Sequence, residues 1–425
     1  MAMIRPETEM KDSGVQWIGD IPSDWNIKPL YACLDEINQK NNPVVTTNIL
    51  SLTNTDGVIP YSERGNQGNK SKENFEEYKV VYPNTIVANS MNILIGSVGL
   101  SKYEGCVSPV YYVYMAKPQV DIRYMNYLFQ MEPFQKRLRQ FANGILEIRL
   151  RVSSHDILHQ KVAVPDYDEQ QVIADYLDET CSQIDEIIAE AKASIDEYKE
   201  LKQSVIFEAV TKGLDKNVKM KDSGVEWIGE IPESWNIRML NQYVSQVKCK
   251  NSDLSETNLL SLSYGKIKRK NINSNDGLLP ESFDNYNVVD ENDIVLRLTD
   301  LQNDHKSLRV GLVTERGIIT SAYVTIRPNG INAAYLALLL HAFDYKKGFY
   351  GMGSGIRQGL TFDGIKSLKI VVPSNFEQDD IVKHIMKMTE KCDSLISEKE
   401  SLINDLEAYK KSLIYEVVTG KRRVV

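Results

Sequence analysis

Cysteine is scarce in this 425-residue chain and is not arranged for metal binding or cross-linking. The five cysteines are odd in number and include no CxxC pair, which argues against a disulfide framework and a zinc ribbon. Long apolar runs are also missing, because the most apolar stretch, residues 331–340, is far shorter than the ~20 residues that span a bilayer. The opening residues, MAMIRPETEM, contain no apolar segment typical of a secretion signal. We therefore expect a cytoplasmic protein that does not enter a membrane.

The sequence also lacks the motifs of the enzymes that act on DNA. It has neither the glycine-rich S-adenosylmethionine loop nor the Asn/Asp-Pro-Pro-Tyr/Phe element of an amino-methyltransferase. Residues 65–71, GNQGNKS, have the wrong spacing for a Walker A loop. Asp166 and Glu197 could suggest a nuclease motif, but about 45 Å of helix would separate them. His155 and His159 stand four residues apart without a third metal ligand nearby. We expect no catalytic residue, no metal site and no cofactor in this chain.

The strongest positive feature is an internal repeat. Residues 10–30 match residues 220–240 at 15 of 21 positions, with a constant offset of 210. Similarity fades after the TNILSL and TNLLSL segments and returns at residues 162–177 and 370–385, at an offset of 208. Each copy therefore has a shared opening block, a divergent body and a shared tail. A duplicated scaffold can keep its core while its surface drifts, but here a whole segment diverges, including its apolar pattern, which suggests two readers of different targets.

The tails are predicted to be long helices, about 60 Å for residues 170–212, that begin after a proline and end near a glycine. A seam of mainly apolar residues follows the alternating spacing of four and three that is typical of a coiled coil. Lys202 and Lys410 occupy one matching place on the two seams. The two helices could pair parallel or antiparallel, and the pattern does not choose. The second seam is the less regular, because Lys399 stands where the first has Ala191. The seam comprises Leu177, Cys181, Ile184, Ile188, Ala191, Ile195, Tyr198, Lys202, Val205 and Ala209 in the first tail, and Ile385, Thr389, Cys392, Ile396, Lys399, Ile403, Leu406, Lys410, Leu413 and Val417 in the second.

The bodies are predicted to be mixed α/β, with short β-rich runs between Gly, Asn, Asp and Pro residues. Helical stretches are expected at residues 121–140 and 333–342. The predicted domains are residues 1–165, a first helix at 166–214, residues 215–373 and a second helix at 374–425.

Charge is segregated along the chain, although the net charge is −8. Residues 26–165 hold 15 Lys+Arg against 12 Asp+Glu, or +3, and residues 236–373 hold 17 against 13, or +4. The first tail, residues 166–208, holds 13 acids against 3 lysines, or −10. Basic bodies could contact DNA, whereas an acidic tail would face either a protein partner or solvent.

Polar and basic clusters in the bodies are candidate DNA contacts, because Lys, Arg, Asn and Gln reach phosphates and base edges. Ordinary exposed loops have similar compositions. Two clusters follow the TNILSL and TNLLSL segments in comparable places, and a third group surrounds two arginines that coincide at the offset of 208. These two arginines suggest a common phosphate contact or a common structural salt bridge about equally. The candidates are Arg64, Asn66, Gln67, Lys70, Lys72, Arg149, Arg151, Tyr264, Lys266, Lys268, Arg269, Lys270, Arg357 and Gln358.

The repeated blocks resemble the specificity subunit of type I restriction-modification enzymes. The resemblance rests on KDSGVQWIGDIPSDW at residues 11–25, KDSGVEWIGEIPESW at 221–235, the P…EQ..I runs at 165–173 and 373–381, and the FEAVT and YEVVT helix ends. The blocks recur in the same order over nearly the whole chain. We expect their tryptophans, Trp17, Trp25, Trp227 and Trp235, to form a shared framework near the helices or a partner.

The resemblance implies a fold and a set of partners. Two α/β target recognition domains would each read one half of a split site on double-stranded DNA, in a pseudo-two-fold repeat. An antiparallel coiled coil of the two helices would set the distance between the half-sites. The chain would bind two methyltransferase subunits and two restriction-translocase subunits, which would carry S-adenosylmethionine, ATP and magnesium. A standalone two-site DNA-binding regulator and a coiled-coil scaffold remain as alternatives.

Overall fold

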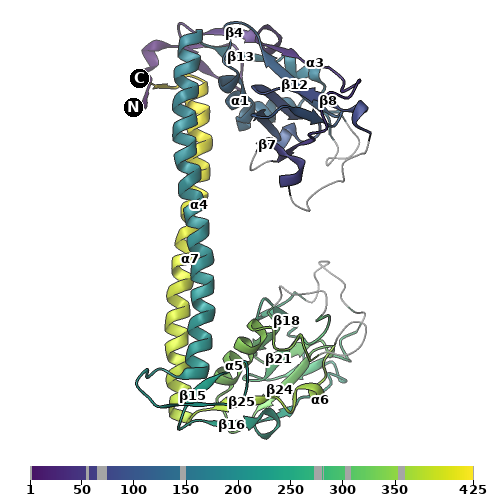
Figure 1. Cartoon of the computed structure of the whole chain (residues 1–425), viewed down its shortest axis with the longest axis vertical. Coiled ribbons are helices and arrows are strands. Elements are labelled where there is room, and N and C mark those ends of the chain that lie inside the picture. The colour runs from purple at the N-terminus through teal and green to yellow at the C-terminus, as the bar shows by residue number, and fades with distance from the viewer. Residues whose placement is uncertain are drawn as a thin grey trace. The chain divides into compact units, whose positions relative to one another are not determined.

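The computed structural model describes residues 2–53, 57–64, 74–143, 150–271, 280, 282–301, 308–352 and 359–424. The chain divides into two compact units, one of residues 1–191 and 401–425 and the other of residues 192–400. Each unit contains one α/β body and one half of each long helix, α4 (Tyr167–Lys212) and α7 (Asn375–Val418) (Figure 1). The domain limits predicted from the sequence separate bodies from helices, a different division that stays a prediction.

Strands and short helices make up the body of the first unit. The strands are β1 (Ala2–Ile4), β2 (Met10–Asp12), β3 (Asp20–Pro22), β4 (Asn26–Pro29), β5 (Leu34–Glu36), β6 (Leu50–Thr53), β7 (Gly57–Pro60), β8 (Lys79–Val81), β9 (Thr85–Asn89), β10 (Val98–Ser101), β11 (Gly105–Val107), β12 (Tyr111–Ala116) and β13 (Lys161–Val164). The helices are α1 (Ile122–Gln130), α2 (Glu132–Arg139) and α3 (Ser154–Leu158), and β26 (Arg422–Val424) pairs with β1.

The second unit repeats this plan. Its strands are β14 (Met220–Asp222), β15 (Glu230–Pro232), β16 (Asn236–Met239), β17 (Val244–Gln246), β18 (Leu260–Ser263), β19 (Lys266–Arg269), β20 (Asn287–Val289), β21 (Ile294–Leu296), β22 (Val310–Leu312), β23 (Gly317–Ile319), β24 (Val324–Pro328) and β25 (Lys369–Val372). Its helices are α5 (Ala333–Tyr345) and α6 (Phe362–Ile365).

An antiparallel four-stranded sheet is the centre of each body, and both sheets have the same order. The first is β10-β9-β12-β5 and the second is β22-β21-β24-β17. A glycine at the matching place in each edge strand, Gly99 or Gly311, makes room for a hairpin that crosses the sheet. A Cβ atom on Gly311 would lie 2.5 Å from a methyl carbon of Leu262 in β18, too close for two carbon atoms. The predicted mixed α/β class is confirmed.

The predicted helical stretch at residues 121–140 is two helices, because a proline interrupts it. Met131 is extended between α1 and α2, with φ −68° and ψ 126°, and Pro133 has no N–H to continue the helical hydrogen bonds. The side chain of Gln135 supplies the missing donor, since its Nε2 lies 3.2 Å from the carbonyl oxygen of Phe129.

Capping side chains begin both long helices. The Asp166 carboxylate accepts from the backbone N–H of Glu169 at 2.8 Å. At the other helix, Ser374 and Glu377 form a reciprocal capping box: the Ser374 hydroxyl accepts from the Glu377 N–H, and the Glu377 carboxylate accepts from the Ser374 N–H. These contacts satisfy donors that have no partner within the helix.

The two long helices pair antiparallel, as contacts inside each unit show. In the first unit, Lys410 in the last third of α7 donates to Asp185 in the first half of α4, at 2.6 Å. In the second unit, Lys202 in the last quarter of α4 donates to Asp393 in the first half of α7. Both pairs have the same members after a shift of 208. The antiparallel coiled coil implied by the family resemblance is therefore confirmed.

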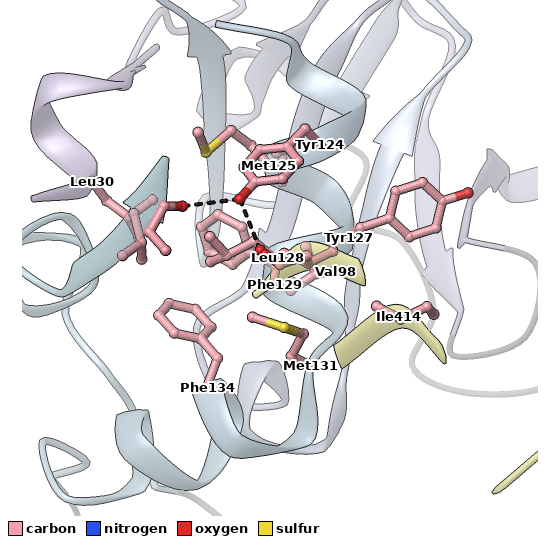
Figure 2. Close-up of a cluster of buried hydrophobic side chains, with 14 of the residues drawn as sticks. Leu30, Val98, Tyr124, Met125, Tyr127, Leu128, Phe129, Met131, Phe134 and Ile414 are labelled. Carbon is pink, nitrogen blue, oxygen red and sulfur yellow. Dashed lines mark hydrogen bonds between the residues drawn. The ribbon is translucent and has the colours of Figure 1, made fainter. Parts of the chain in front are cut away.

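A buried tyrosine joins each body to the helices. The Tyr124 hydroxyl of α1 donates to the carbonyl oxygens of Ala163 and Val418, both at 2.9 Å (Figure 2). The Tyr335 hydroxyl of α5 shares its proton between Val371 and Val210 in the same way, at 3.1 Å each. Each hydroxyl thus contacts the strand that enters one long helix and the end of the other.

We expect Tyr335→Phe to destabilise the second unit by about 1–3 kcal/mol, because two buried carbonyl oxygens would lose their donor. Denaturant unfolding followed by fluorescence would measure the change. Tyr409→Phe is the control, since Tyr409 is 47% exposed. Equal unfolding midpoints for the two variants would contradict the expectation.

The helix pairing can be tested by reversing one ion pair. Lys410→Glu should lower the free energy of unfolding by about 1 kcal/mol or less, because it sets a second negative charge beside the half-exposed Asp185. Adding Asp185→Lys should restore stability, and high salt should reduce both effects. If the double variant loses as much free energy of unfolding as the two single variants together, this register is contradicted.

Candidate nucleic-acid interface

The hairpin β18–β19 carries the largest described group of predicted DNA-binding residues. Its strands pair antiparallel, with Ser263 opposite Lys266 beside the turn. The two turn residues, Tyr264 and Gly265, have φ values of 48° and 75°. Positive φ at both central residues is typical of the type I′ turn, whose twist suits a two-residue hairpin. The turn therefore holds the hairpin as a compact, twisted ribbon.

The two faces of this hairpin differ in chemistry. Leu260, Leu262 and Ile267 face the body and join one apolar cluster with residues of the sheet. Side chains alternate along a strand, so Ser261 and its cross-strand neighbour Lys268 lie on the opposite face. One face anchors the ribbon, and the other presents hydroxyl and ammonium groups.

The cations of the hairpin are not equivalent. Arg269 is engaged by Glu315, whose two carboxylate oxygens lie 2.7 and 2.8 Å from the arginine Nε. The Arg269 guanidinium holds the pKa of Glu315 below its ordinary value. Lys266, Lys268 and Lys270 are exposed. Within the described residues, these three lysines take part in none of the ion pairs.

The first body has an equivalent hairpin, β6–β7, but with different side chains. Backbone contacts fix the equivalence: the Lys270 N–H donates to the carbonyl of Leu259, and the Tyr61 N–H donates to that of Ile49, each at 2.8 Å. Counting along the paired strands, Gly57, Ile59 and Tyr61 occupy the places of Lys266, Lys268 and Lys270. The basic ribbon thus belongs to the second body alone.

This equivalence corrects the sequence prediction that the two basic loops lie in comparable places. Arg64 follows β7 and a short 3-10 helix, and so lies beyond the hairpin. Its guanidinium lies 5.5 Å from the centre of the Tyr61 ring. The comparison by sequence failed because Arg64 lies twelve residues after the TNILSL segment, whereas Tyr264 lies only two residues after TNLLSL.

Other candidate residues lie elsewhere or outside the described residues. Arg151 is exposed, and its backbone N–H and carbonyl bond to Asn143 at 2.9 and 2.8 Å. The candidates outside the described residues are Asn66, Gln67, Lys70, Lys72, Arg149, Arg357 and Gln358. Their assignment as DNA contacts stays a prediction.

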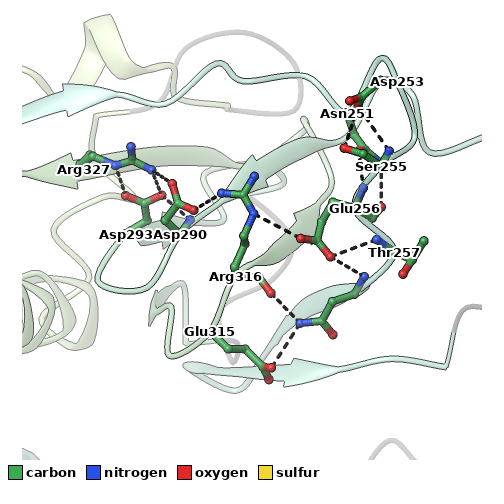
Figure 3. Close-up of polar contacts among 11 residues, drawn as sticks. Asn251, Asp253, Ser255, Glu256, Thr257, Asp290, Asp293, Glu315, Arg316 and Arg327 are labelled. Atoms are coloured by element: carbon green, nitrogen blue, oxygen red, sulfur yellow. Dashed lines mark hydrogen bonds and ion pairs between the residues drawn. The ribbon is translucent and has the colours of Figure 1, made fainter.

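A network of ion pairs beside the second hairpin was not predicted (Figure 3). Arg316 bonds to Asp290 at 2.6 Å and lies 3.3 Å from Glu256, while Arg327 bonds to Asp290 and Asp293, both at 2.7 Å. Its members are far apart in the sequence and follow no local pattern, so the sequence carries no signal for it. The network engages both arginines with carboxylates.

The first body keeps the backbone of this region and changes its charge. Asn48 donates to the carbonyl oxygen of Glu104 at 2.8 Å, and Asn258 donates to that of Arg316 at 2.7 Å. Glu104 and Arg316 therefore stand at one structural position with opposite charges. The two bodies present different electrostatic surfaces on the same scaffold.

The opening blocks, by contrast, make the same contacts in both units. The Trp25 indole N–H donates to Glu169 at 2.8 Å, in the first turn of α4, and the Trp235 N–H donates to Glu377 at 2.9 Å, in the first turn of α7. Both tryptophans are 1% exposed. Trp17 packs on Phe134, with ring centroids 5.4 Å apart.

A glycine ends each long helix against one of these tryptophans. Gly420, φ 72°, follows α7, and a Cβ atom there would lie 3.0 Å from Trp25. Gly213, φ 77°, follows α4, and its Cβ would lie 3.0 Å from Trp235. Glycine adopts this left-handed conformation freely, so the chain can leave the helix while passing close to the indole. The remaining tryptophan of the second unit, Trp227, packs on Phe343, with ring centroids 5.0 Å apart.

The predicted seam is buried to different depths. In the first tail, Ile206 is buried and Val205 is only half-buried, because the end of α4 joins the apolar cluster of the second body. The buried seam residues include Leu177, Cys181, Ile184, Ile188, Ala191, Ile195, Ile385, Cys392, Leu413 and Val417. The half-buried ones include Tyr198, Ile396, Ile403 and Leu406.

The described residues offer neither a metal site nor a membrane-spanning helix. Among the described residues, no group of three His, Cys, Asp or Glu side chains could hold a metal ion. The His155 and His159 rings are stacked on each other, 3.9 Å apart. In the part of the chain that the structure describes, no helix is both long and apolar enough to cross a membrane.

These features define a class of protein. Its members have two α/β bodies that share a framework, differ in surface chemistry and are attached to two antiparallel helices. Solved structures have this fold. A chain from a structure of a type I R-M system matches with TM-score 0.69 and 11% identity, covering 94% of this chain and 99% of that one. The HsdS subunit from Thermoanaerobacter tengcongensis matches with TM-score 0.52 and 12% identity, covering 94% and 98%.

Sequence comparisons indicate the same class. The family described as type I restriction modification DNA specificity domain matches residues 22–197. A Methanocaldococcus jannaschii protein, named as the type I restriction enzyme MjaX specificity subunit, is 24% identical over 437 residues, 96% of each chain. Residues 22–197 carry the type I restriction modification DNA specificity domain, and the resemblance to the specificity subunits seen in the sequence is confirmed. The role of this family is DNA target recognition, and its members are non-catalytic subunits.

The contact between tryptophan and glutamate should make stability depend on pH. Burial raises the pKa of Glu377, but hydrogen bonds from Trp235 and Ser374 outweigh it and lower the pKa below its ordinary value. A carboxyl group whose pKa is lowered by folding adds stability above its unfolded pKa, about 4.3, and loses it as the pH falls through the folded value. Wild type should therefore exceed Glu377→Gln in stability near pH 7, and the difference should shrink as the pH falls from about 4.3 through the lowered folded pKa. Denaturant unfolding from pH 3 to 7 measures it, and a difference independent of pH would contradict it.

Proposed function

We propose that this chain reads a split target on double-stranded DNA, with one half-site for each body and a spacing set by the two long helices. One observation carries the proposal: the framework contacts are repeated in both units, whereas exposed positions on the same scaffold have changed. Glu104 is replaced by Arg316, and Gly57 by Lys266. A scaffold that keeps its internal contacts while changing its exposed charges suits two readers of different sequences.

The repeated framework also supports two copies of one partner. Because residues 11–25 and 221–235 form closely similar blocks, a protein that binds one of them can bind the other. We assign these surfaces to two methyltransferase subunits, and the complete complex would add two restriction-translocase subunits. S-adenosylmethionine, ATP and magnesium would be bound by those partners. All five cysteines are free thiols. Thiols stay reduced in the cytoplasm, where we expect the protein to bind DNA.

The proposal can be tested by selection from a random DNA pool, with the full chain and its methyltransferase. We expect enrichment of one motif with two specific segments and a non-specific spacer of constant length. Methylated adenines mapped in host DNA should fall within the two segments. Light scattering of the reconstituted complex should give two methyltransferase subunits for each specificity chain.

The spacing role predicts the effect of lengthening both helices. Inserting one heptad after Ala191 and one after Glu400, where the chain passes between the compact units, keeps the seam in phase. Seven residues add about 10 Å of helix, or about three base pairs at 3.4 Å each. The selected motif should keep its two segments and gain a longer spacer.

Three outcomes would count against the proposal. An unchanged spacer would reject the ruler role of the helices. Binding to a split motif without any association with a methyltransferase would favour a standalone regulator. No DNA binding at low salt, even with methyltransferase present, would reject DNA reading altogether.

A further inference from the structure

We infer that the hairpin β18–β19 is the DNA-contacting ribbon of the second body, entering the major groove with Tyr264 at its tip, and that the first body reads its half-site without such a ribbon. This inference rests on the proposed function and names the element that carries it out in one of the two bodies. The supporting observations are the shape of the hairpin, its charge and the conformation of its turn.

The shape of the β18–β19 hairpin suits the major groove of DNA. The major groove of B-DNA is about 12 Å wide and admits a two-stranded ribbon. The hairpin has four cross-strand pairs and the tightest common turn, so no bulky loop widens its tip. Its inner face is fixed to the body by Leu260 and Leu262, which are 2% and 9% exposed. The ribbon can therefore meet DNA without refolding.

The positive charges of the hairpin lysines lie on the face that does not contact the body. Lys266 and Lys268 alternate with Ile267, so that they share the face opposite the apolar anchor, and Lys270 follows the strand. Arg269 stands opposite Leu260 and is engaged by Glu315. In the described part of the chain, the three lysines have no carboxylate partner, so their charge is available to phosphates.

The turn residue Tyr264 has no evident structural purpose. Its φ of 48° is unfavourable for a residue with a side chain, and Asn, Asp or Gly is normally found there. Packing does not compensate, because Tyr264 is 77% exposed. An aromatic ring kept at a strained, exposed tip and followed by three exposed lysines suggests contact with a ligand. Bases and thymine methyl groups offer the apolar surfaces that such a ring can contact.

The comparison between bodies makes the inference specific. At the places of Lys266 and Lys268 the first body has Gly57 and Ile59, which carry no charge. If the ribbon reads DNA, its removal should affect one half-site only. This asymmetry can be measured.

The experiment uses the full chain with its methyltransferase and three fluorescent duplexes. One carries the selected target, and each of the others has one half-site scrambled. Binding is followed by anisotropy between 50 and 300 mM KCl. Lys266→Gln with Lys268→Gln should weaken binding and lower the slope of log Kd against log salt by about 1.8. Lys248→Gln with Lys369→Gln, two exposed lysines of the same body away from the hairpin, is the matched control and should leave the slope nearly unchanged.

Tyrosine variants separate the ring from the turn. Tyr264→Asn suits the left-handed conformation, so thermal stability should stay equal or rise while affinity for the target falls roughly ten-fold. The loss should disappear on the duplex whose second half-site is scrambled and persist on the duplex whose first half-site is scrambled. A merely structural tyrosine would not show this dependence on one half-site.

The outcomes distinguish the inference from the proposed function. If wild type reads a split target but the hairpin variants bind like the Lys248/Lys369 control, the ribbon is rejected and the proposed function stands. If the affinity losses fall equally on both half-sites, assignment of the ribbon to the second body is rejected. If wild type shows no sequence preference, the proposed function itself fails.

Discussion

Each body is held to the long helices through a buried tryptophan, and the rest of the structure depends on this junction. The Trp25 N–H donates to a glutamate in the first turn of α4, while its ring lies against the glycine that ends α7. Trp235 makes the same contacts with the start of α7 and the end of α4. One side chain thus joins the opening block to the start of one helix and the end of the other. The buried indole N–H needs the carboxylate as its hydrogen-bond acceptor, because an unpaired buried donor is costly. The residue that ends the helix must be glycine, because the indole ring leaves no room for a side chain there.

Variation is tolerated elsewhere because the junctions and the sheets do not use the exposed residues of the bodies. The two sheets keep one strand order, and Gly99 and Gly311 leave the same room for a hairpin. On top of this scaffold, Lys266 replaces Gly57 and Arg316 replaces Glu104. Such exchanges alter surface potential without disturbing apolar contacts, so they can change recognition at little cost in stability.

The sequence predicted best where the structure is periodic or repeated. The seam through Leu177, Ile184 and Ile188 follows local spacing, and a helix must bury such a stripe. The duplication was visible because the framework tolerates few changes around Trp25 and Trp235. The split of residues 121–140 into two helices was missed, although Pro133 marks it. Strand order could not be predicted, since pairing between β9 and β12 joins segments distant in the chain.

The candidate interface shows the same division. Composition alone drew attention to residues 264–270, and the structure places them on one hairpin. It also engages Arg269 with Glu315, which lies 46 residues away, a contact that no local pattern contains. The sequence by itself determined the duplication, the helices and the family, because these depend on local periodicity and repeated text. Only the tertiary structure decided which cations are free, which hairpins are equivalent and how the helices pair, because contacts between distant segments determine all three.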